Sequence, residues 1–355
     1  MPVIISYRGV AVFLVALVGF VPLSCNRYAQ PKHSLAVFTN PLLPSGPDPW
    51  NLHKDGFYYY THTLGNRLAI WKTRNLDSLK HAESKVIWQP PEGTMYSRNI
   101  WAPEIHFIDN KWYVYFAADD GRNENHRMYV LENTAADPMD GEWKLKGKVA
   151  DADDKWAIDG SVFSHDGVMY MVWSGWEGDV NGQQDLYIAR MANPWTISGK
   201  RVRISSPRFD WERNGELNDA QNPRFVYVNE GPQYLRHDKD VFIIYSASGC
   251  WTDHYGLGML RLMGNNLMDS ASWVKSPNPV FASAPENGVY GPGHNSFFKS
   301  PDGRQDWILY HANSEPGQGC GRFRSPRAQR FTWNKDGTPN FGKPLKPGEP
   351  IEAPR

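Results

Sequence analysis

The sequence carries no excess of charge of either sign. Its 38 Lys and Arg residues balance 38 Asp and Glu residues, so the formal net charge is zero. Proteins that bind DNA or RNA usually present a basic surface to the phosphates, and this balance therefore excludes a nucleic-acid partner. Long charged or low-complexity tracts are missing as well, which argues against a largely disordered chain.

Cysteine is scarce, with three residues in 355. None has the CxxC or Cys/His spacing of a structural zinc site, so no metal centre of that kind is expected. Cys25 lies in the amino-terminal segment described below, which leaves Cys250 and Cys320. Two cysteines do not make a disulfide framework, and the sequence leaves open whether they form one bridge or stay unlinked.

The amino-terminal hydrophobic run is too short to cross a membrane. Residues 10–21 are 12 apolar or glycine residues, whereas a membrane-spanning helix needs about 20. Arg8 before the run and Ser24-Cys25 after it resemble a secretory signal of the bacterial lipoprotein type, with Cys25 as the acylated residue. Ordinary signal cleavage near the same place is the alternative.

Three regions are predicted from this pattern: a signal peptide over 1–24, a polar tether over 25–35, and one folded domain over 36–355. With either kind of cleavage the protein is exported, as a periplasmic protein, an outer-membrane-anchored lipoprotein or a secreted protein. Membrane anchoring is expected only through a lipidated Cys25. Length alone would suggest two domains of about 150 residues each, but all-β folds often exceed that size as one unit.

Aromatic residues and turn formers, in contrast, are abundant. The chain has 15 Trp, 17 Tyr and 16 Phe, together with 31 Gly and 27 Pro. Aromatic residues favour strands, while Gly and Pro favour the turns between them. Trp and Tyr also suit a binding surface that combines apolar faces with hydrogen-bonding groups.

Short aromatic strands recur five times, each directly after a polar turn that contains aspartate. The strands that follow these turns read FYYYTH, KWYVYFAA, VMYMVWSGW, VFIIYSAS and DWILYHAN, and the turns begin at Asp55, Asp109, Asp166, Asp238 and Asp302. Their alternation is typical of strands, and no helical pattern competes with it. Five units of this size predict an all-β fold, a five-bladed β-propeller with its site on the central axis. A many-stranded sandwich is the alternative.

A polar motif precedes each of these turns, where the innermost strand of a blade would line the central channel. The key residues are Asp48, Glu104, Asp159, Glu230 and His294, each close to Pro, Gly or Trp. Five such residues in phase with the repeat predict one polar cluster on the axis. Carboxylates crowded there would have raised pKa values, which suits a paired acid and base in glycosidic bond hydrolysis. A cation that holds the propeller together and a lectin-like binding site are the competing interpretations.

The motifs DPW, WAPE, AIDGSVF, NEGPQ and GHNSF, in this order, resemble glycoside hydrolase family 43. The resemblance covers about residues 40–343. NPLLPSGPDPW, RNIWAPEIH and SPRAQRFTW are most similar to the α-L-arabinofuranosidase branches of that family.

The resemblance implies an inverting single displacement, and it assigns the roles. Asp48 is the expected general base, Glu230 the general acid, and Asp159 the carboxylate that orients Glu230 and raises its pKa. Arg327 is expected near the base, with Arg324 as the competing choice. His294 is expected to contact substrate, or a hydrated cation through water, and a histidine buried in the core is its alternative.

Further substrate-binding residues are predicted around this site: Trp50, Trp101, Glu104, Trp176 and Trp251, with His62, Asn99, Asn222 and Tyr290 as rim candidates. Of the four tryptophans, about two are expected to contact sugar. For Glu104, the alternative is that it holds a neighbouring loop.

The resemblance implies an enzyme that releases α-L-arabinofuranose from arabinan or arabinoxylan-type polysaccharides of the plant cell wall. The alternatives are a β-xylosidase or endo-arabinanase on the same scaffold, or a non-catalytic carbohydrate-binding propeller. No cofactor is required, although calcium or another cation in the channel remains open. A monomer is expected.

Overall fold

The structure is a computed structural model that describes residues 1–6, 9–10, 36–219 and 221–354. The chain divides into two units, Met1–Leu35 and Ala36–Arg355. The predicted lipidation site, Cys25, and the predicted tether lie outside the described residues, as does most of the predicted signal peptide. Among the residues that the structure describes, none belongs to a helix with the length and apolar character needed to cross a membrane.

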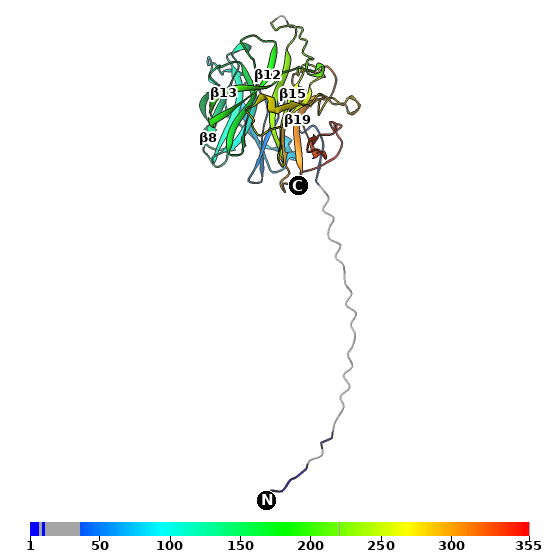
Figure 1. Cartoon of the computed structure of the whole chain (residues 1–355). Coiled ribbons are helices and arrows are strands. Elements are labelled where there is room, and N and C mark those ends of the chain that lie inside the picture. The colour runs from blue at the N-terminus through cyan, green and yellow to red at the C-terminus, as the bar shows by residue number, and fades with distance from the viewer. Residues whose placement is uncertain (7–8, 11–35, 220, 355) are drawn as a thin grey trace. The chain divides into compact units, whose positions relative to one another are not determined.

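The second unit is a five-bladed β-propeller, as predicted, and not a sandwich (Figure 1). Each blade is a four-stranded antiparallel sheet. The first blade is β2 (Trp50–Lys54), β3 (Phe57–Thr61), β4 (Leu68–Thr73) and β5 (Glu83–Trp88). The second blade is β6 (Arg98–Ile108), β7 (Lys111–Asp119), β8 (Arg127–Asn133) and β9 (Lys144–Val149). The third blade is β10 (Ala157–His165), β11 (Val168–Gly175), β12 (Gln183–Asn193) and β13 (Thr196–Ser205).

The last two blades have short outer strands. The fourth is β14 (Tyr227–His237), β15 (Asp240–Ala247), β16 (Gly256–Leu262) and β17 (Trp273–Lys275), and the fifth is β18 (Tyr290–Lys299), β19 (Asp306–Asn313), β20 (Ser325–Trp333) and β21 (Pro339–Asn340). A short parallel contact between β12 and β14 joins the third and fourth blades. The described helices are single 3-10 segments: η1 (Leu76–His81), η2 (Asn123–Asn125), η3 (Asp210–Glu212), η4 (Ser270–Ser272) and η5 (Pro285–Asn287).

The five innermost strands form a closed ring. Contacts run from β2 to β6, β10, β14 and β18, and β18 returns to β2. Next to this seam, the first strand β1 (Val37–Phe38) pairs antiparallel with the last strand β22 (Ile351–Glu352). Phe38 and Ile351 pack in one apolar cluster with residues of the first and fifth blades. The two ends of the unit therefore close the ring together.

The predicted turns set the register of the inner hairpins. Asp55-Gly56, Asp109-Asn110 and Asp166-Gly167 all have positive φ angles at both positions. These angles define a two-residue type I′ turn, whose twist matches that of paired strands, and Asp, Asn and Gly tolerate them best. The turn residues thus explain why the inner strands of the first three blades reverse directly into the second strand of their blade.

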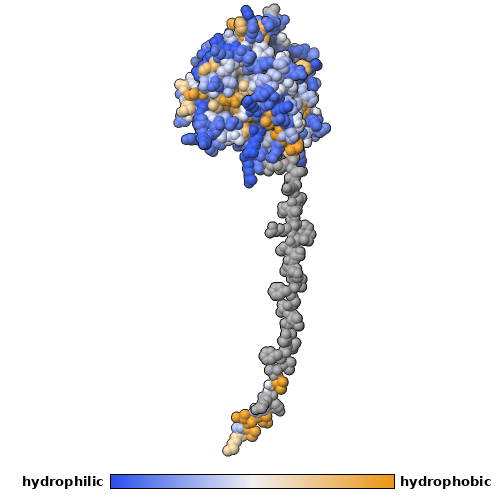
Figure 2. Space-filling view, turned by 90° about the vertical axis from the view of Figure 1, so that its right-hand side faces the viewer, coloured by the Kyte–Doolittle hydropathy of each residue, from blue (hydrophilic) through white to orange (hydrophobic). Residues whose placement is uncertain are grey.

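Most aromatic residues serve the packing between blades. Five apolar clusters lie between neighbouring blades, one at each junction of the ring. Strand β7 contributes to two of them, because Val114 and Phe116 face the first blade while Tyr113 and Tyr115 face the third. This alternation is the two-residue period of a strand buried on both faces. The outer surface seen in Figure 2 is mostly hydrophilic, and its hydrophobic residues form separate small patches.

Candidate active site

A left-handed residue interrupts the inner strand of four blades, and in the first blade it lies two positions before that strand. These residues are Asp48, Ala102, Asp159, Gly231 and His294, with φ between 45° and 56°. In the first four blades this residue stands seven positions before the turn aspartate. The predicted equivalence of five polar residues was therefore only partly right: Glu104 lies two positions after the repeated site, and Glu230 one position before it.

These irregular segments open onto a cavity of about 460 Å³. Asp48, Asp159, Glu230 and His294 all line it, so the structure brings the three predicted catalytic carboxylates together. The other lining residues are Thr63, Trp101, Asn123, Trp156, Ile158, Asn181, Gln184, Leu217, Asn222, Val226, Cys250, Trp251, Cys320 and Arg324. A pocket with aromatic, amide and carboxylate walls suits a sugar, which offers both apolar faces and hydroxyl groups.

Asp48 is held as an ionised carboxylate. Arg324 Nη1 donates to Asp48 Oδ1 at 2.8 Å, and Thr63 Oγ1 donates to Asp48 Oδ2 at 2.6 Å. Burial by itself would raise the pKa of Asp48, but the Arg324 guanidinium, the two nearby histidines and the Thr63 hydrogen bond hold that pKa well below its usual value. A carboxylate that stays charged near neutral pH can accept a proton from water.

Glu230 has the opposite character. Its side chain is buried, and Tyr255 donates its hydroxyl hydrogen to Glu230 Oε1 at 2.7 Å. Burial raises the pKa of Glu230 to about 7, with a smaller contribution from the charge of Asp48 and against the Tyr255 hydrogen bond. A carboxyl with this pKa still holds its proton at mildly acidic pH and can donate it.

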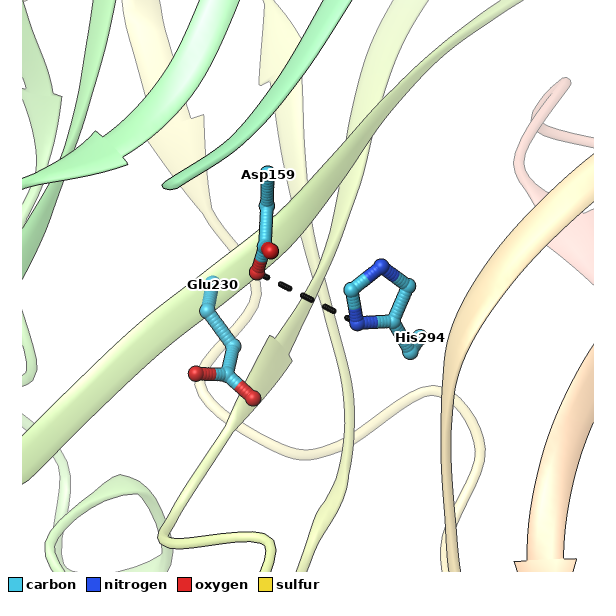
Figure 3. Close-up of side chains that lie close together, drawn as sticks. All are labelled: Asp159, Glu230 and His294. Carbon is cyan, nitrogen blue, oxygen red and sulfur yellow. Dashed lines mark ion pairs between the residues drawn. The ribbon is translucent and has the colours of Figure 1, made fainter. Parts of the chain in front are cut away.

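Asp159 lies beside Glu230. One carboxylate oxygen of Asp159, one of Glu230 and a ring nitrogen of His294 all lie within 4.8 Å of one another (Figure 3). Asp159 Oδ2 accepts a 3.0 Å hydrogen bond from the backbone N–H of Gly231, the residue next to the acid. Burial, followed by the charge of Glu230, raises the pKa of Asp159 well above its usual value. The two carboxyl groups therefore titrate as a pair that retains a proton near neutral pH.

Two buried histidines lie next to Asp48, and of these His294 lines the cavity. His294 Nδ1 lies 3.4 Å from Asp48 Oδ1 and 3.9 Å from Asp159 Oδ2, and His311 Nδ1 accepts a 3.0 Å hydrogen bond from the backbone N–H of Asp48. Burial lowers the pKa of both histidines. Both imidazoles are therefore neutral at neutral pH, and Arg324 supplies the full positive charge next to Asp48.

The arginine near the base is Arg324, the competing choice, and the prediction for Arg327 was wrong. The Arg327 side chain is fully buried and does not line the cavity; its Nη2 donates to Ser314 Oγ at 2.8 Å. Arg324 precedes strand β20, whereas Arg327 lies within it and pairs with Tyr310 of β19. A residue inside a central strand is held in the blade, while one in the preceding loop can reach the axis.

Two of the four predicted tryptophans, Trp101 and Trp251, line the cavity, and two do not. Trp176 is buried behind Trp156, with ring centroids 4.8 Å apart in a stack, and Trp156 takes its place in the wall. Trp50 donates its indole N–H to the carbonyl of Ile105 at 2.8 Å, below the cavity. The prediction that Trp50 and Trp176 form pocket walls was therefore wrong.

Glu104 likewise does not reach the cavity. Its carboxylate accepts a hydrogen bond from Gln233 Nε2 at 2.5 Å and lies 3.0 Å from His106 Nε2. It joins the inner strands of the second and fourth blades, which matches the alternative role of holding neighbouring structure. Of the rim candidates, Asn222 lines the cavity, while His62, Asn99 and Tyr290 do not.

Several residues of the site were not singled out in the sequence. Thr63, Tyr255 and Trp156 contact the catalytic groups or the cavity from loops or from segments next to strands. Only the position of Tyr255, directly before the strand GLGMLR, gave a signal, because such strand ends face the axis. The structure also joins Cys250 to Cys320 in a disulfide, the question that the sequence left open.

Comparison with known proteins agrees with this geometry. Residues 38–339 match the glycosyl hydrolases of family 43. The chain is 40% identical over 328 residues to the extracellular exo-alpha-(1->5)-L-arabinofuranosidase of Streptomyces avermitilis, covering 90% of this chain and 66% of that protein. It is 41% identical over 284 residues to the protein of that name from Streptomyces chartreusis, covering 78% of this chain and 83% of that protein.

A solved structure shares the fold over nearly its full length. The α-L-arabinofuranosidase of Lactobacillus brevis superimposes with a TM-score of 0.80 at 37% sequence identity, over 88% of this chain and 98% of that one. The match of residues 38–339 and the identity to relatives covered over most of their length establish the family. This chain belongs to the glycosyl hydrolases of family 43.

Proposed function

We propose that this protein is an inverting, exo-acting α-L-arabinofuranosidase that releases α-L-arabinofuranose from arabinan or arabinoxylan-type plant polysaccharides. One observation carries the proposal: a single sugar-sized cavity holds one carboxylate, Asp48, kept ionised and one carboxyl, Glu230, whose pKa rises to about 7. The names of the two Streptomyces relatives and of the Lactobacillus structure support arabinofuranose as the sugar.

In this proposal, Asp48 removes a proton from the attacking water while Glu230 protonates the leaving glycosidic oxygen. An inverting pair needs a gap of roughly 6.5–9.5 Å between its carboxyl groups so that a water can enter. Asp159 titrates as a pair with Glu230, which lets the pair retain a proton near neutral pH, and it fixes the acid's position through the Gly231 backbone. The ionised base and the protonated acid coexist because Arg324 stabilises charge at one end of the cavity and burial disfavours it at the other.

The test is proton NMR of the first-formed sugar from an aryl α-L-arabinofuranoside. Inversion gives β-arabinofuranose first, and release of the α-anomer first would reject the mechanism. A panel of aryl arabinofuranoside, aryl xyloside and debranched arabinan separates the enzyme alternatives, because a β-xylosidase prefers the second substrate. An endo-arabinanase would release oligosaccharides from the third rather than arabinose.

A non-catalytic carbohydrate-binding propeller is the alternative from another class. It has no need for an acid and a base of opposite protonation state in one pocket. Asp48→Ala and Glu230→Ala separate the two readings: full turnover by both variants would reject the site, and inactivity of the unaltered protein on the whole panel would favour binding. The chain spans 66% of the Streptomyces avermitilis relative, so the activity of the whole protein is part of the proposal.

The proposal extends to export, anchoring and assembly. The relatives named extracellular, and a disulfide in the folded unit, support export to an oxidising compartment. We propose lipidation of Cys25 as the anchor, which mass spectrometry of the native amino terminus would test. A monomer is expected by light scattering.

The proton steps use only Asp48 and Glu230, so EDTA is expected to leave activity unchanged. A loss of activity that calcium restores would favour a channel cation near His294.

A further inference from the structure

The Cys250–Cys320 disulfide lies in the wall of the cavity. It joins two residues 70 positions apart, with Cα atoms 5.0 Å from each other. Cys250 follows strand β15 of the fourth blade, and Cys320 lies between β19 and β20 of the fifth. The covalent bond therefore crosses from one blade to the next at the mouth of the catalytic site.

The loop that carries Cys250 also holds the general acid. It runs over residues 248–255, between β15 and β16. Trp251 forms part of the cavity wall, and Tyr255, at the other end of the loop, donates to Glu230 Oε1 at 2.7 Å. Gly293 leaves the space that the Tyr255 ring occupies, since a Cβ there would lie 2.2 Å from the ring.

The loop that carries Cys320 holds the general base. It runs over residues 314–324 and ends at Arg324, whose Nη1 contacts Asp48 Oδ1 at 2.8 Å. Glycines flank the cysteine on both sides, at Gly319 and Gly321, and Gly319 has a φ of 65°. Glycine gives the backbone more freedom than any other residue, so this segment has little conformational preference of its own.

We propose that the Cys250–Cys320 disulfide is a positioning element of the catalytic site: it fixes the loop that holds the acid to the loop that holds the base. The inference rests on the proposed function. Without the bond, the described contacts between these two loops include a pair of hydrogen bonds from the backbone N–H of Gly317 to the carboxylate of Asp253, at the exposed side. The Arg324 backbone keeps its own hydrogen bond from the Gly46 N–H to its carbonyl. With so few described contacts between the two loops, however, the glycine-rich segment could shift against the loop of the acid and displace the Arg324 side chain from Asp48.

Proton transfer is sensitive to the positions of the acid and the base, so a shift of the loops that hold them should lower the rate. Small displacements of groups that orient the reacting residues can reduce turnover by one to two orders of magnitude. We expect reduction of the disulfide to lower kcat about tenfold or more while KM changes less. Reoxidation is expected to restore kcat, because the blades themselves do not depend on the bond for their strand pairing.

The experiment compares oxidised protein, protein reduced with a phosphine, and reoxidised protein on an aryl α-L-arabinofuranoside. Alkylation and peptide mass mapping establish that Cys250 and Cys320 have been reduced, and circular dichroism establishes that the fold persists. Cys250→Ser/Cys320→Ser is the matched control, since the reductant should not change its kcat. This variant also provides a second measurement if reduction of the unaltered protein is incomplete.

A second background separates positioning from general stability. In Arg324→Ala/Tyr255→Phe, both contacts that the disulfide is proposed to align are already absent. Reduction should then change kcat by less than about twofold, because the effects of groups that act through one another are not additive. An equal fold loss in both backgrounds, or an unchanged kcat with both thiols alkylated, would overturn the inference. If the oxidised protein does not cleave the substrate at all, the proposed function fails instead.

Discussion

Arg324 donates a hydrogen bond of 2.8 Å to Asp48, although 276 positions separate the two residues in the chain. Asp48 precedes the first blade, and Arg324 precedes the third strand of the fifth. The charge environment of the base therefore exists only when the ring of blades has closed. Folding and catalytic competence are linked at this contact.

Arg324→Ala should raise the pKa of Asp48, because its carboxylate loses the full positive charge that opposes the effect of burial. A base must be ionised, so activity would be lost as pH falls through the raised pKa. We expect the acidic limb of the kcat/KM profile to move to higher pH, and kcat/KM to fall about tenfold to a hundredfold.

Arg324→Lys should recover part of this loss, since it restores a charge without the same geometry. Arg327→Lys is the comparison for the arginine that the structure places inside the blade. This substitution should lower the melting temperature and leave kcat/KM nearly unchanged. A profile for Arg324→Ala that overlies that of the unaltered enzyme would contradict the assigned role.

The alkaline limb should report Glu230. Its pKa is raised to about 7, chiefly by burial, and the acid is competent only while protonated. We therefore expect kcat/KM to be level at mildly acidic pH and to fall about tenfold per pH unit well above 7. An aryl substrate with a good leaving group needs little proton donation, so its loss above pH 7 should be smaller.

Glu230→Gln removes the acid without changing the size of the side chain. Its rate deficit should be large on natural linkages and should shrink on aryl substrates with activated leaving groups. An equal deficit on both kinds of substrate would count against the acid role.

Asp159→Asn should separate stability from activity. Burial and the charge of Glu230 raise the folded-state pKa of Asp159 well above its usual value. The stability linked to this group is fully present below its unfolded-state pKa and is lost as pH rises toward the folded-state pKa. The variant should therefore melt at a higher temperature than the unaltered protein at pH 8, and at a similar temperature at pH 4.

The same substitution should lower kcat/KM about a hundredfold, because Glu230 loses the carboxyl group with which it titrates as a pair. Asn can still accept the Gly231 N–H, so the backbone next to the acid stays in place. Thermal unfolding followed at both pH values, together with the kinetics, checks the prediction. A melting temperature that falls at pH 8 would show that the charge is not a net cost there.

The sequence predicted those features that depend on local chemistry. Asp-Gly and Asp-Asn turns set the inner hairpins of the first three blades because few residues tolerate positive φ at both positions, and the turn aspartates of all five units predicted the five blades. Asp48, Asp159 and Glu230 could be placed in one site because their motifs recur in phase with these turns, and all three line the cavity. Glu104 was misplaced by the same rule: the repeated feature is a left-handed backbone residue, here Ala102, and its side chain need not be polar.

Contacts between loops of different blades could not be predicted in the same way. Arg324 and Arg327 differ by three positions, and only the start of β20 decides which of them lies in the loop. Trp156 directly precedes the inner strand β10 and Trp176 directly follows the second strand β11, and their stacking order decides which of them faces the cavity. Side-chain packing in three dimensions sets these outcomes, and no periodic signal records them.

The cavity tryptophans can be tested by their effect on substrate binding. Trp101 and Trp251 line the cavity, whereas Trp50 lies below it with its N–H bonded to the Ile105 carbonyl. We expect Trp101→Ala and Trp251→Ala to raise KM for an aryl α-L-arabinofuranoside about threefold to tenfold, from the lost contact with the sugar.

Trp50→Phe is the matched control, because it keeps an aromatic ring while it loses the indole hydrogen bond and part of the packed ring surface. Its KM should stay unchanged, while the loss of that bond costs about 1 kcal/mol of stability. Steady-state kinetics and thermal unfolding measure the two effects separately. An increase of KM for Trp50→Phe that equals the increase for Trp101→Ala would mean that sugar reaches below the cavity floor, and the placement of the substrate would have to move toward Glu104.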